Sequence, residues 1–124
     1  MRKNATFREL IVWQKAIELA KEVYRRTQRM PGSERFGLTA QMRRTVVSVA
    51  SNVAEGNARR GRTEYLRFLA IARGSLAELE TQLLIARDLE MMACPESLME
   101  SIHEIRRMLQ ALIQSLRNSS QPQA

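Results

Sequence analysis

The sequence contains a single cysteine, Cys94, and only three prolines and five glycines among its 124 residues. One cysteine excludes an internal disulfide framework and a cysteine-based metal cluster within the chain. The scarcity of helix-breaking residues, together with 44% hydrophobic residues, is typical of an ordered, helix-rich protein. At this length we expect one domain over residues 1–117, followed by a flexible tail over residues 118–124.

Long apolar runs are absent as well. The apolar stretch near the N-terminus is interrupted directly after Trp13 by Gln14 and Lys15, which does not fit a signal peptide. No segment approaches the roughly 20 apolar residues that a membrane-spanning helix needs. We therefore expect a soluble, cytoplasmic protein that does not bind membranes.

Acidic residues are in the minority. The chain has 13 Asp plus Glu against 20 Lys plus Arg, a net charge of +7, and all but three of these cations are arginine. The planar guanidinium group of arginine matches the geometry of phosphate and carboxylate groups. This composition favours contact with a polyanion or an acidic protein, and a basic surface that serves only solubility is the alternative.

Apolar residues recur at three- and four-residue steps in four segments, as on one face of an α-helix. Because the connections between them are short, the pattern predicts an all-α fold, an antiparallel up-down-up-down four-helix bundle. The expected boundaries are residues 7–29 after a capping box at Thr6 and Glu9, Thr39 as N-cap to about Gly56, Thr63 as cap to about residue 91, and a fourth helix from Pro95.

Apolar side chains exceed the single stripe per helix that a monomeric bundle needs. We expect Phe36 and Leu38, in the first connection, to cover one end of the core. The remaining apolar side chains should be exposed and should support self-association. They are Val12, Leu19, Phe68, Ile71, Ile85 and Leu89.

Polar residues interrupt the apolar faces of the second and third segments. A glycine inside a helix costs about 1 kcal/mol relative to alanine, so Gly74 predicts a close approach between these two helices. A tight hairpin near Gly61 sets residues whose numbers sum to about 122 against each other, which places Ser48 opposite Gly74. The same register predicts two charge pairs, Arg44 with Glu78 and Glu55 with Arg67. We interpret the set as a structural polar seam: Arg44, Ser48, Asn52, Glu55, Gly74, Ser75 and Glu78.

These polar residues do not form a catalytic pattern. Nucleophilic catalysis by Ser48 would need an adjacent base, and the only histidine, His103, lies on the fourth segment. Residues 56–63 are one substitution from the phosphate-binding loop GxxxxGK[ST], but that loop follows a β-strand and uses a lysine. We therefore expect no enzymatic activity, no cofactor and no metal, with Cys94 in a turn and His103 at the solvent edge.

Basic residues gather at the end of the bundle that should hold both termini and the second connection. The arginines of that connection precede a helix N-terminus, whose free N–H groups also favour anions. We predict that this end binds the phosphate backbone of a nucleic acid without reading bases; a solvated arginine loop is the alternative. The predicted nucleic-acid-binding residues are Arg59, Arg60, Arg62 and Arg67, helped by Arg2 and Lys3.

Three motifs carry a resemblance to a known family. They are Leu10-x-x-Trp13-x-x-Ala16, then Pro31-x-x-Glu34-x-x-x-Leu38-x-x-Gln41-x-x-Arg44-x-x-x-Ser48-x-x-x-Asn52-x-Ala54-Glu55-Gly56, and Phe68-Leu69-x-x-Ala72-Arg73-Gly74-Ser75-x-x-Glu78. With them the chain resembles the four-helix-bundle family of 23S rRNA intervening-sequence proteins, small bacterial proteins of which some are encoded within insertions in large-subunit rRNA genes. A related branch serves as an accessory factor to the reverse transcriptases of diversity-generating retroelements.

The resemblance implies an antiparallel bundle, a ring-shaped homo-oligomer that is a pentamer, and association with nucleic acid, with no enzymatic activity. The family often has proline between the Ser and Asn of the second helix; Ala50 stands in that segment here and should leave the helix straighter. The leading interpretation is a non-catalytic oligomeric protein that binds the backbone of RNA or DNA. The alternative is an interaction scaffold whose basic end binds an acidic protein partner such as a reverse transcriptase.

Overall fold

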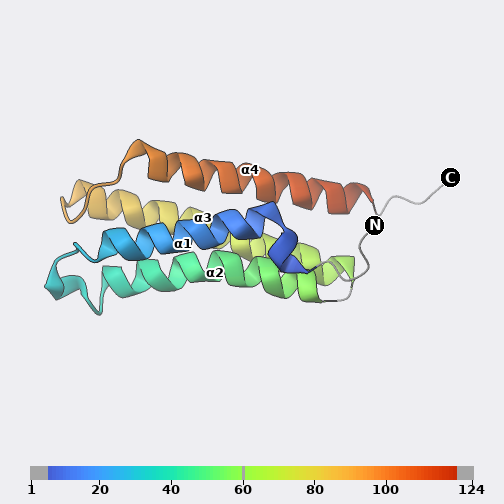
Figure 1. Ribbon diagram of the computed structural model, residues 1–124, viewed down its shortest axis with the longest axis horizontal. Coiled ribbons are helices and arrows are strands. Elements are labelled where there is room, and N and C mark those ends of the chain that lie inside the picture. The colour runs from blue at the N-terminus through green and yellow to red at the C-terminus, as the bar shows by residue number, and fades with distance from the viewer. Residues whose placement is uncertain (1–5, 60, 120–124) are drawn as a thin grey trace.

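The computed structural model describes residues 6–59 and 61–119 and contains four long α-helices in those ranges. They are α1 (Ile11–Thr27), α2 (Leu38–Ala58), α3 (Arg62–Asp88) and α4 (Glu96–Asn118), and two 3-10 turns, η1 (Phe7–Glu9) and η2 (Gly32–Glu34), precede α1 and α2. Successive helices run in opposite directions, and each helix packs against the next, with α1 closing the bundle against α4 (Figure 1). The predicted four-helix bundle is confirmed.

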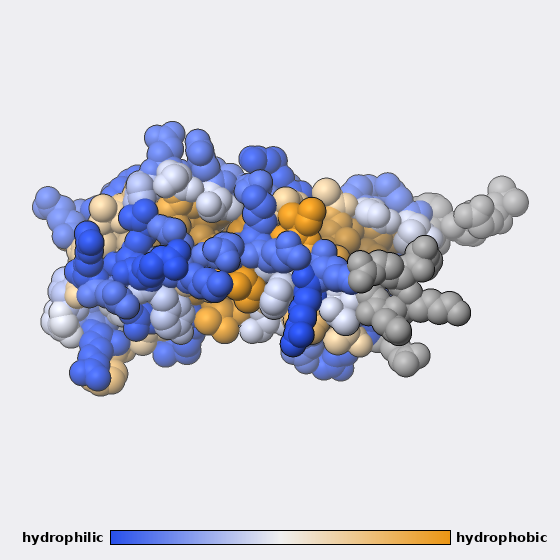
Figure 2. Space-filling view, in the orientation of Figure 1, coloured by the Kyte–Doolittle hydropathy of each residue, from blue (hydrophilic) through white to orange (hydrophobic). Residues whose placement is uncertain are grey.

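The core is a continuous column of aliphatic side chains from all four helices. The predicted inner stripes of α2 and α3 are buried, among them Met42, Val46, Leu76 and Leu83. From the face shown in Figure 2, polar side chains cover most of the surface and apolar ones show in narrow bands between the helices. The helices are therefore held together chiefly by apolar burial.

Three of the six apolar residues predicted to be exposed are in the core. Val12 and Leu19 are buried because α1 is apolar on two adjacent stripes, and the stripe that carries them faces the core between α2 and α4. Phe68 is buried as well and is only 7% exposed. Ile71, Ile85 and Leu89 are exposed, as predicted.

The first helix does not begin at Phe7. Thr6 accepts a hydrogen bond from the Arg8 backbone N–H at 3.3 Å, but this caps only the turn η1, and the extended residue Leu10 (φ −75°, ψ 125°) separates η1 from α1. The side chains of residues six apart in one helix point in directions about 120° apart. The edge-to-face contact between Phe7 and Trp13, with ring centroids 5.2 Å apart, therefore requires this break.

The start of α2 is capped by a residue other than Thr39. The carboxylate of Glu34 accepts a hydrogen bond from the Leu38 backbone N–H at 3.1 Å, while Thr39 lies buried in the first turn of the helix. The prediction of Thr39 as cap was wrong because the cap comes from the preceding 3-10 turn, outside the helical pattern.

Of the two residues expected to cover one end of the core, Leu38 packs against it, as predicted, whereas Phe36 does not, since 87% of it is exposed.

The remaining boundaries differ from the prediction by short distances. α2 continues past Gly56 to Ala58, and α3 begins at Arg62 after Gly61, whose φ of 112° suits glycine. Pro95 directly precedes α4, as expected for a proline at a helix start. Asn118, assigned to the tail, still belongs to α4, and residues 120–124 of the predicted tail lie outside the described residues. Across residues 6–59 and 61–119, no helix combines the length and the apolarity that crossing a bilayer requires.

Candidate nucleic-acid interface

The hairpin between α2 and α3 holds a compact cluster of two arginines, two glutamates and one phenylalanine. Arg59 is the residue at the C-terminal end of α2, and Arg67 lies on the second turn of α3. Their guanidinium carbons lie 5.1 and 4.6 Å from the centroid of the Phe68 ring. Because both face the same ring, the two cations are within about 10 Å of each other. We call Glu55, Arg59, Glu64, Arg67 and Phe68 the arginine cluster.

Gly56 allows this cluster to form. A Cβ atom at Gly56 would lie 2.7 Å from Cβ of Phe68 and 3.2 Å from Cδ1 of Tyr65, so a larger residue would push α3 away. Tyr65, one of the two aromatic residues that pack there, is also held by a hydrogen bond, which Asn57 Nδ2 donates to its hydroxyl at 3.2 Å. This is the close approach between α2 and α3 that was predicted at Gly74.

Each arginine of the cluster is paired with a glutamate on its own helix or helix end. Arg59 binds Glu55 at 2.9 Å, and Arg67 binds both carboxylate oxygens of Glu64 at 3.1 and 3.2 Å. The hydrogen bonds from Arg67 lower the pKa of Glu64, and the charge of Arg59 lowers it further. Glu64 raises the pKa of Arg67, with a smaller contribution from Glu55, so the four charges act as one electrostatic unit.

The predicted pair between Glu55 and Arg67 is therefore wrong. Glu55 and Arg59 are four residues apart, and Glu64 and Arg67 three apart, so both pairs form within one turn without ordering a long side chain across the hairpin. Arg62, the first residue of α3, is exposed and makes no ion pair among residues 6–59 and 61–119. Three further predicted binding residues, Arg2, Lys3 and Arg60, lie outside the described residues.

Two more arginines lie at the same end of the bundle. Arg8 is in η1, and Arg117 is in the last turn of α4, which ends at the same side as the α2–α3 connection (Figure 1). The fold thus brings Arg59, Arg62 and Arg67 to an end of the bundle that also carries other cations. Glu64 and Phe68 are the members of the arginine cluster that the sequence did not predict, although the position of Phe68 directly after Arg67 and opposite Gly56 was a signal for it.

The polar seam exists along α2 and α3, in a different register from the predicted one. The Ser48 hydroxyl is hydrogen-bonded to that of Ser75 at 2.9 Å, one residue beyond the predicted partner Gly74. Asn52 does not cross to α3: its Nδ2 donates to the carbonyl and the hydroxyl of Ser48, at 2.8 and 2.9 Å. A further crossing that the sequence did not predict joins Gln82 Nε2 to the Thr45 hydroxyl at 3.1 Å.

Two other seam predictions are corrected. Arg44 and Glu78 line one shallow groove with Ser48 and Ser75, but no ion pair joins them; Glu78 is instead close to Gln82 Nε2, at 3.4 Å. Gly74 faces outward, and a Cβ atom added there would meet nothing within 4 Å. It points away from α2 because the inner face of α3 is fixed by the leucines of the core.

The side chains that could act as nucleophile or base lie on different segments of the bundle. The hydrogen-bond partners of Ser48 are hydroxyl and amide groups, and no base is among them. His103 lies on α4, where its Nε2 is 3.4 Å from the carboxylate of Glu80, which Arg106 also binds. Cys94 is half-buried, and desolvation raises the pKa of its thiol; a neutral thiol is a poor nucleophile. Within the described ranges, no three His, Cys, Asp or Glu side chains gather as they would around a metal ion.

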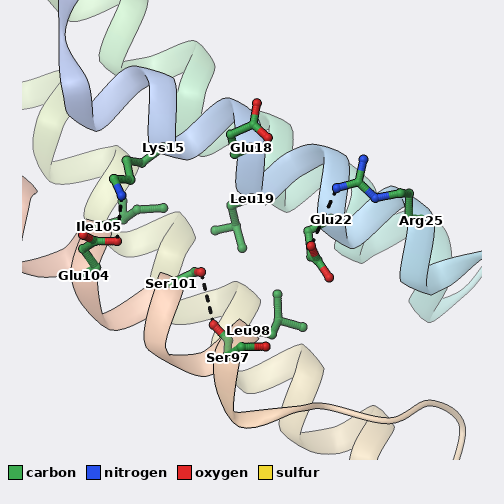
Figure 3. Close-up of a pocket in the computed structure, with 10 residues that line it drawn as sticks. All are labelled: Lys15, Glu18, Leu19, Glu22, Arg25, Ser97, Leu98, Ser101, Glu104 and Ile105. Carbon is green, nitrogen blue, oxygen red and sulfur yellow. Dashed lines mark hydrogen bonds and ion pairs between the residues drawn. The ribbon is translucent and has the colours of Figure 1, made fainter.

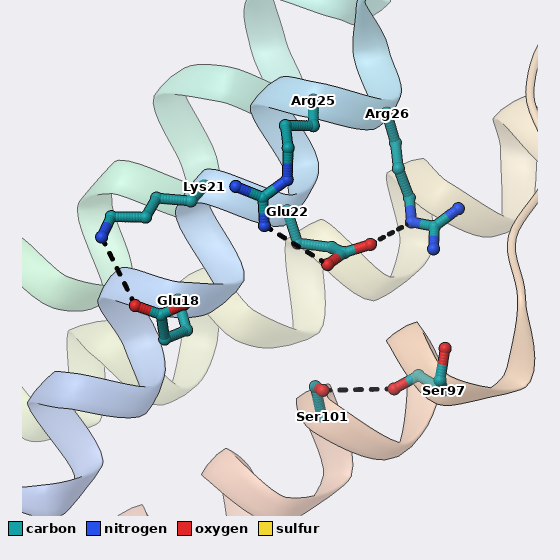
Figure 4. Close-up of polar contacts among 7 residues, drawn as sticks. All are labelled: Glu18, Lys21, Glu22, Arg25, Arg26, Ser97 and Ser101. Carbon is teal, nitrogen blue, oxygen red and sulfur yellow. Dashed lines mark hydrogen bonds and ion pairs between the residues drawn. The ribbon is translucent and has the colours of Figure 1, made fainter.

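A groove lies between α1 and α4. Figure 3 shows that it is lined by acidic, basic and apolar side chains from both helices. Lys15 crosses it to Glu104 at 3.3 Å, and Glu22 is bound by both Arg25 and Arg26 (Figure 4). Because its charges of both signs are paired with each other, this groove does not favour an anion.

The comparisons with known proteins agree with this fold. The family model of the 23S rRNA-intervening sequence protein matches residues 8–111. A solved structure from Bacteroides thetaiotaomicron, described as a protein of unknown function from the S23 ribosomal protein family, is similar with a TM-score of 0.75 and 23% sequence identity. The similarity covers 84% of this chain and 96% of the other, and at this identity it shows the fold alone. No curated protein matches the sequence significantly. The family match spans most of the sequence, and the chain belongs to the 23S rRNA-intervening sequence protein family.

Proposed function

We propose that the protein is a non-catalytic, oligomeric nucleic-acid-binding protein. It contacts the phosphate backbone of RNA or DNA through Arg59, Arg62 and Arg67, together with Arg60, Arg2 and Lys3. The observation that carries this proposal is the arginine cluster, in which two guanidinium groups pack on one phenylalanine ring at the end of the α2–α3 hairpin. Guanidinium groups in such a pair can bind neighbouring phosphates of one strand.

Two features support binding of an anion at this place. Arg62 is at the N-terminus of α3, where free backbone N–H groups and the helix dipole favour negative charge. The ion pairs of Arg59 and Arg67 involve side chains that are about half exposed, and such pairs contribute only about 0.2–1 kcal/mol. A phosphate can therefore replace a glutamate at small cost.

The proposal is tested by titrating labelled structured RNA and duplex DNA with the protein at low salt. Replacing Arg59, Arg60 and Arg62 by alanine should weaken binding by at least tenfold, because three phosphate contacts are lost. The matched control replaces Arg25, Arg29 and Arg35, which removes the same charge from the opposite end of the bundle. No binding of either nucleic acid, or equal binding by both triple variants, would rule the proposal out.

Self-association is the second part of the proposal. Ile71, Ile85 and Leu89 are 41%, 46% and 62% exposed, and their spacing along α3 puts them on one outward face. Gly74 lies on the same face with free space beside it. Such an apolar stripe is more than a monomer needs and supports packing against a second copy, with the pentamer implied by the family as the expected assembly.

The assembly is tested by light scattering at micromolar concentration. Replacing Ile71 and Ile85 by serine should shift the protein toward the monomer. Replacing Ile11, an isoleucine of α1 that is 60% exposed, by serine is the control and should leave the assembly intact. A monomeric wild-type protein would contradict the proposal.

An acidic protein partner is a second candidate ligand for the same end of the bundle. The observation in its favour is that Arg59 and Arg67 already bind carboxylates, those of Glu55 and Glu64. A partner complex that survives nuclease treatment but is lost on replacing Arg59, Arg60 and Arg62 by alanine would favour this alternative.

A further inference from the structure

The two arginines best placed to bind phosphate are both occupied by carboxylates of the same chain. Arg59 is bound by Glu55 and Arg67 by Glu64, and the cluster as described carries two positive and two negative charges. An unoccupied pair of guanidinium groups would bind any anion. The neutral cluster instead makes every incoming anion compete with a glutamate.

The geometry allows such an exchange to take place without unfolding. Both glutamates are about half exposed, so a released carboxylate can be hydrated where it stands. The guanidinium groups stay in position when the carboxylates leave, because each also packs over the Phe68 ring. Phe68 itself is fixed by the close contact with Gly56.

We propose that Glu55 and Glu64 determine the affinity and selectivity of the arginine cluster, by holding Arg59 and Arg67 until a strand supplies phosphates to both. This inference rests on the proposed nucleic-acid function. A single small anion replaces one glutamate with a similar charge and gains little. The second phosphate of a strand is tethered beside the first, so its effective concentration is high and both glutamates are displaced together.

The test uses the full-length protein and a fluorescently labelled oligouridine, with binding followed by anisotropy at low salt. Glu55→Gln and Glu64→Gln should each tighten binding by about two- to fivefold, the range expected for an exposed ion pair. Glu18→Gln removes the same charge from a pair with Lys21 on α1. This control should change binding by less than about 1.5-fold, because a distant exposed charge is screened.

A second comparison uses inorganic phosphate as the competitor. The inhibition constant of phosphate against oligouridine is measured for each protein and corrected for the affinity of that protein for the RNA. It should be several-fold lower for the Glu55→Gln/Glu64→Gln double variant than for the wild type. In an Arg67→Ala background, Glu64→Gln should no longer tighten binding, because the guanidinium group that Glu64 holds is missing.

The outcomes separate this inference from the function on which it rests. If the wild type binds oligouridine but Glu55→Gln and Glu64→Gln behave like Glu18→Gln, the inference is overturned and the nucleic-acid function stands. A tightening by Glu64→Gln that persists in the Arg67→Ala background also overturns it, since the effect would then be general charge. If no variant binds oligouridine although the wild type binds structured RNA or duplex DNA, the inference is overturned and the nucleic-acid function stands; if none of the three nucleic acids is bound, both proposals fall.

Discussion

Two glycines of the α2–α3 hairpin have opposite surroundings. Gly56 lies against Phe68 and Tyr65, where a Cβ atom has no room, whereas Gly74 faces open space. In a helix both give up the stability that alanine would supply, about 1 kcal/mol each. At Gly56 this loss is offset by the packing of the two helices. At Gly74 nothing within the chain offsets it, which is why we associate that position with a contact between copies.

The same substitution should therefore have opposite effects at the two positions. Gly56→Ala should lower the free energy of unfolding by about 1–3 kcal/mol through overpacking, and Gly74→Ala should raise it by about 0.5–1 kcal/mol in the dissociated protein. Urea unfolding, at a protein concentration low enough to keep the protein monomeric, measures the free energy of unfolding of both variants. Equal effects at the two positions would contradict the assigned surroundings.

Glu80 is the charged residue that joins α3 to α4, through Arg106 and His103. The hydrogen bond from Arg106 is the main reason that its pKa lies below the ordinary value of 4.5, and His103 adds to the effect. Since the folded state holds the carboxylate ionised, the stabilisation is present above that ordinary value and is lost as the pH falls through the lowered pKa.

Glu80→Gln should thus destabilise the protein at pH 7 by about 1 kcal/mol. The difference from the wild type should begin to shrink below about pH 4.5, where the unfolded chain takes up a proton, and should vanish below the lowered pKa, where the carboxyl group of the folded wild type is also neutral. Urea unfolding curves at several pH values between about 3 and 7 check this, because the carboxyl group changes its charge within that range. If the difference in free energy of unfolding between the wild type and Glu80→Gln stayed constant over that range, the contact of Glu80 with Arg106 would stabilise the protein by packing and not by charge.

At the scale of the helices, the sequence predicted α3 and α4 and the inner stripes of α2 and α3. It predicted these well because leucine, isoleucine and valine recur at three- and four-residue steps along the inner faces. It failed on α1, where two neighbouring apolar stripes compete and only the tertiary packing selects one. It failed at the start of α2 because the cap, Glu34, comes from a separate turn. The arginines of the candidate interface were predictable from their density, while their pairing was not, since local pairs within one turn form more easily than pairs across the hairpin.

Glu34 and Thr39 give a direct test of which residue caps the start of α2. Glu34→Ala removes the acceptor of the Leu38 N–H and should lower the free energy of unfolding by about 1 kcal/mol. The Thr39 hydroxyl is buried without a hydrogen-bond partner in the described part of the chain, so Thr39→Val should be neutral or stabilising. Thermal unfolding of both variants is the measurement. A loss of stability in Thr39→Val as large as in Glu34→Ala would restore Thr39 as the cap.

At the scale of the whole molecule, net charge is a poor guide to where an anion binds. The chain carries +7, yet the arginine cluster at its candidate interface is neutral, and Arg25, Arg26 and Arg87 are paired with acidic residues of their own helices. The proposed binding would then come from exchange of ion partners and from arginines that make no ion pair within the described residues, such as Arg62. Both contributions depend on the salt concentration.

The salt dependence of binding should report the number of arginines engaged. For a single strand, the slope of log K against log salt should lose about 0.7 in magnitude for each phosphate contact removed. Arg59→Ala and Arg62→Ala should each produce a loss of this size, and Arg35→Ala, at the opposite end, should produce none. An unchanged slope in all three variants would mean that the cations of the hairpin do not contact phosphate.

The short connection between α2 and α3 has a consequence for the order of folding. α2 ends at Ala58 and α3 begins at Arg62, so closing this hairpin costs little chain entropy, and it joins the two helices that pack most closely. We expect the hairpin to form in the folding transition state, with φ-values near 0.5–0.8 for Val49 and Leu76 and low values for residues of α1. Uniform φ-values would contradict this order. The arginine cluster would then be assembled in the transition state, before α1 docks, so that the proposed binding surface does not depend on the docking of α1.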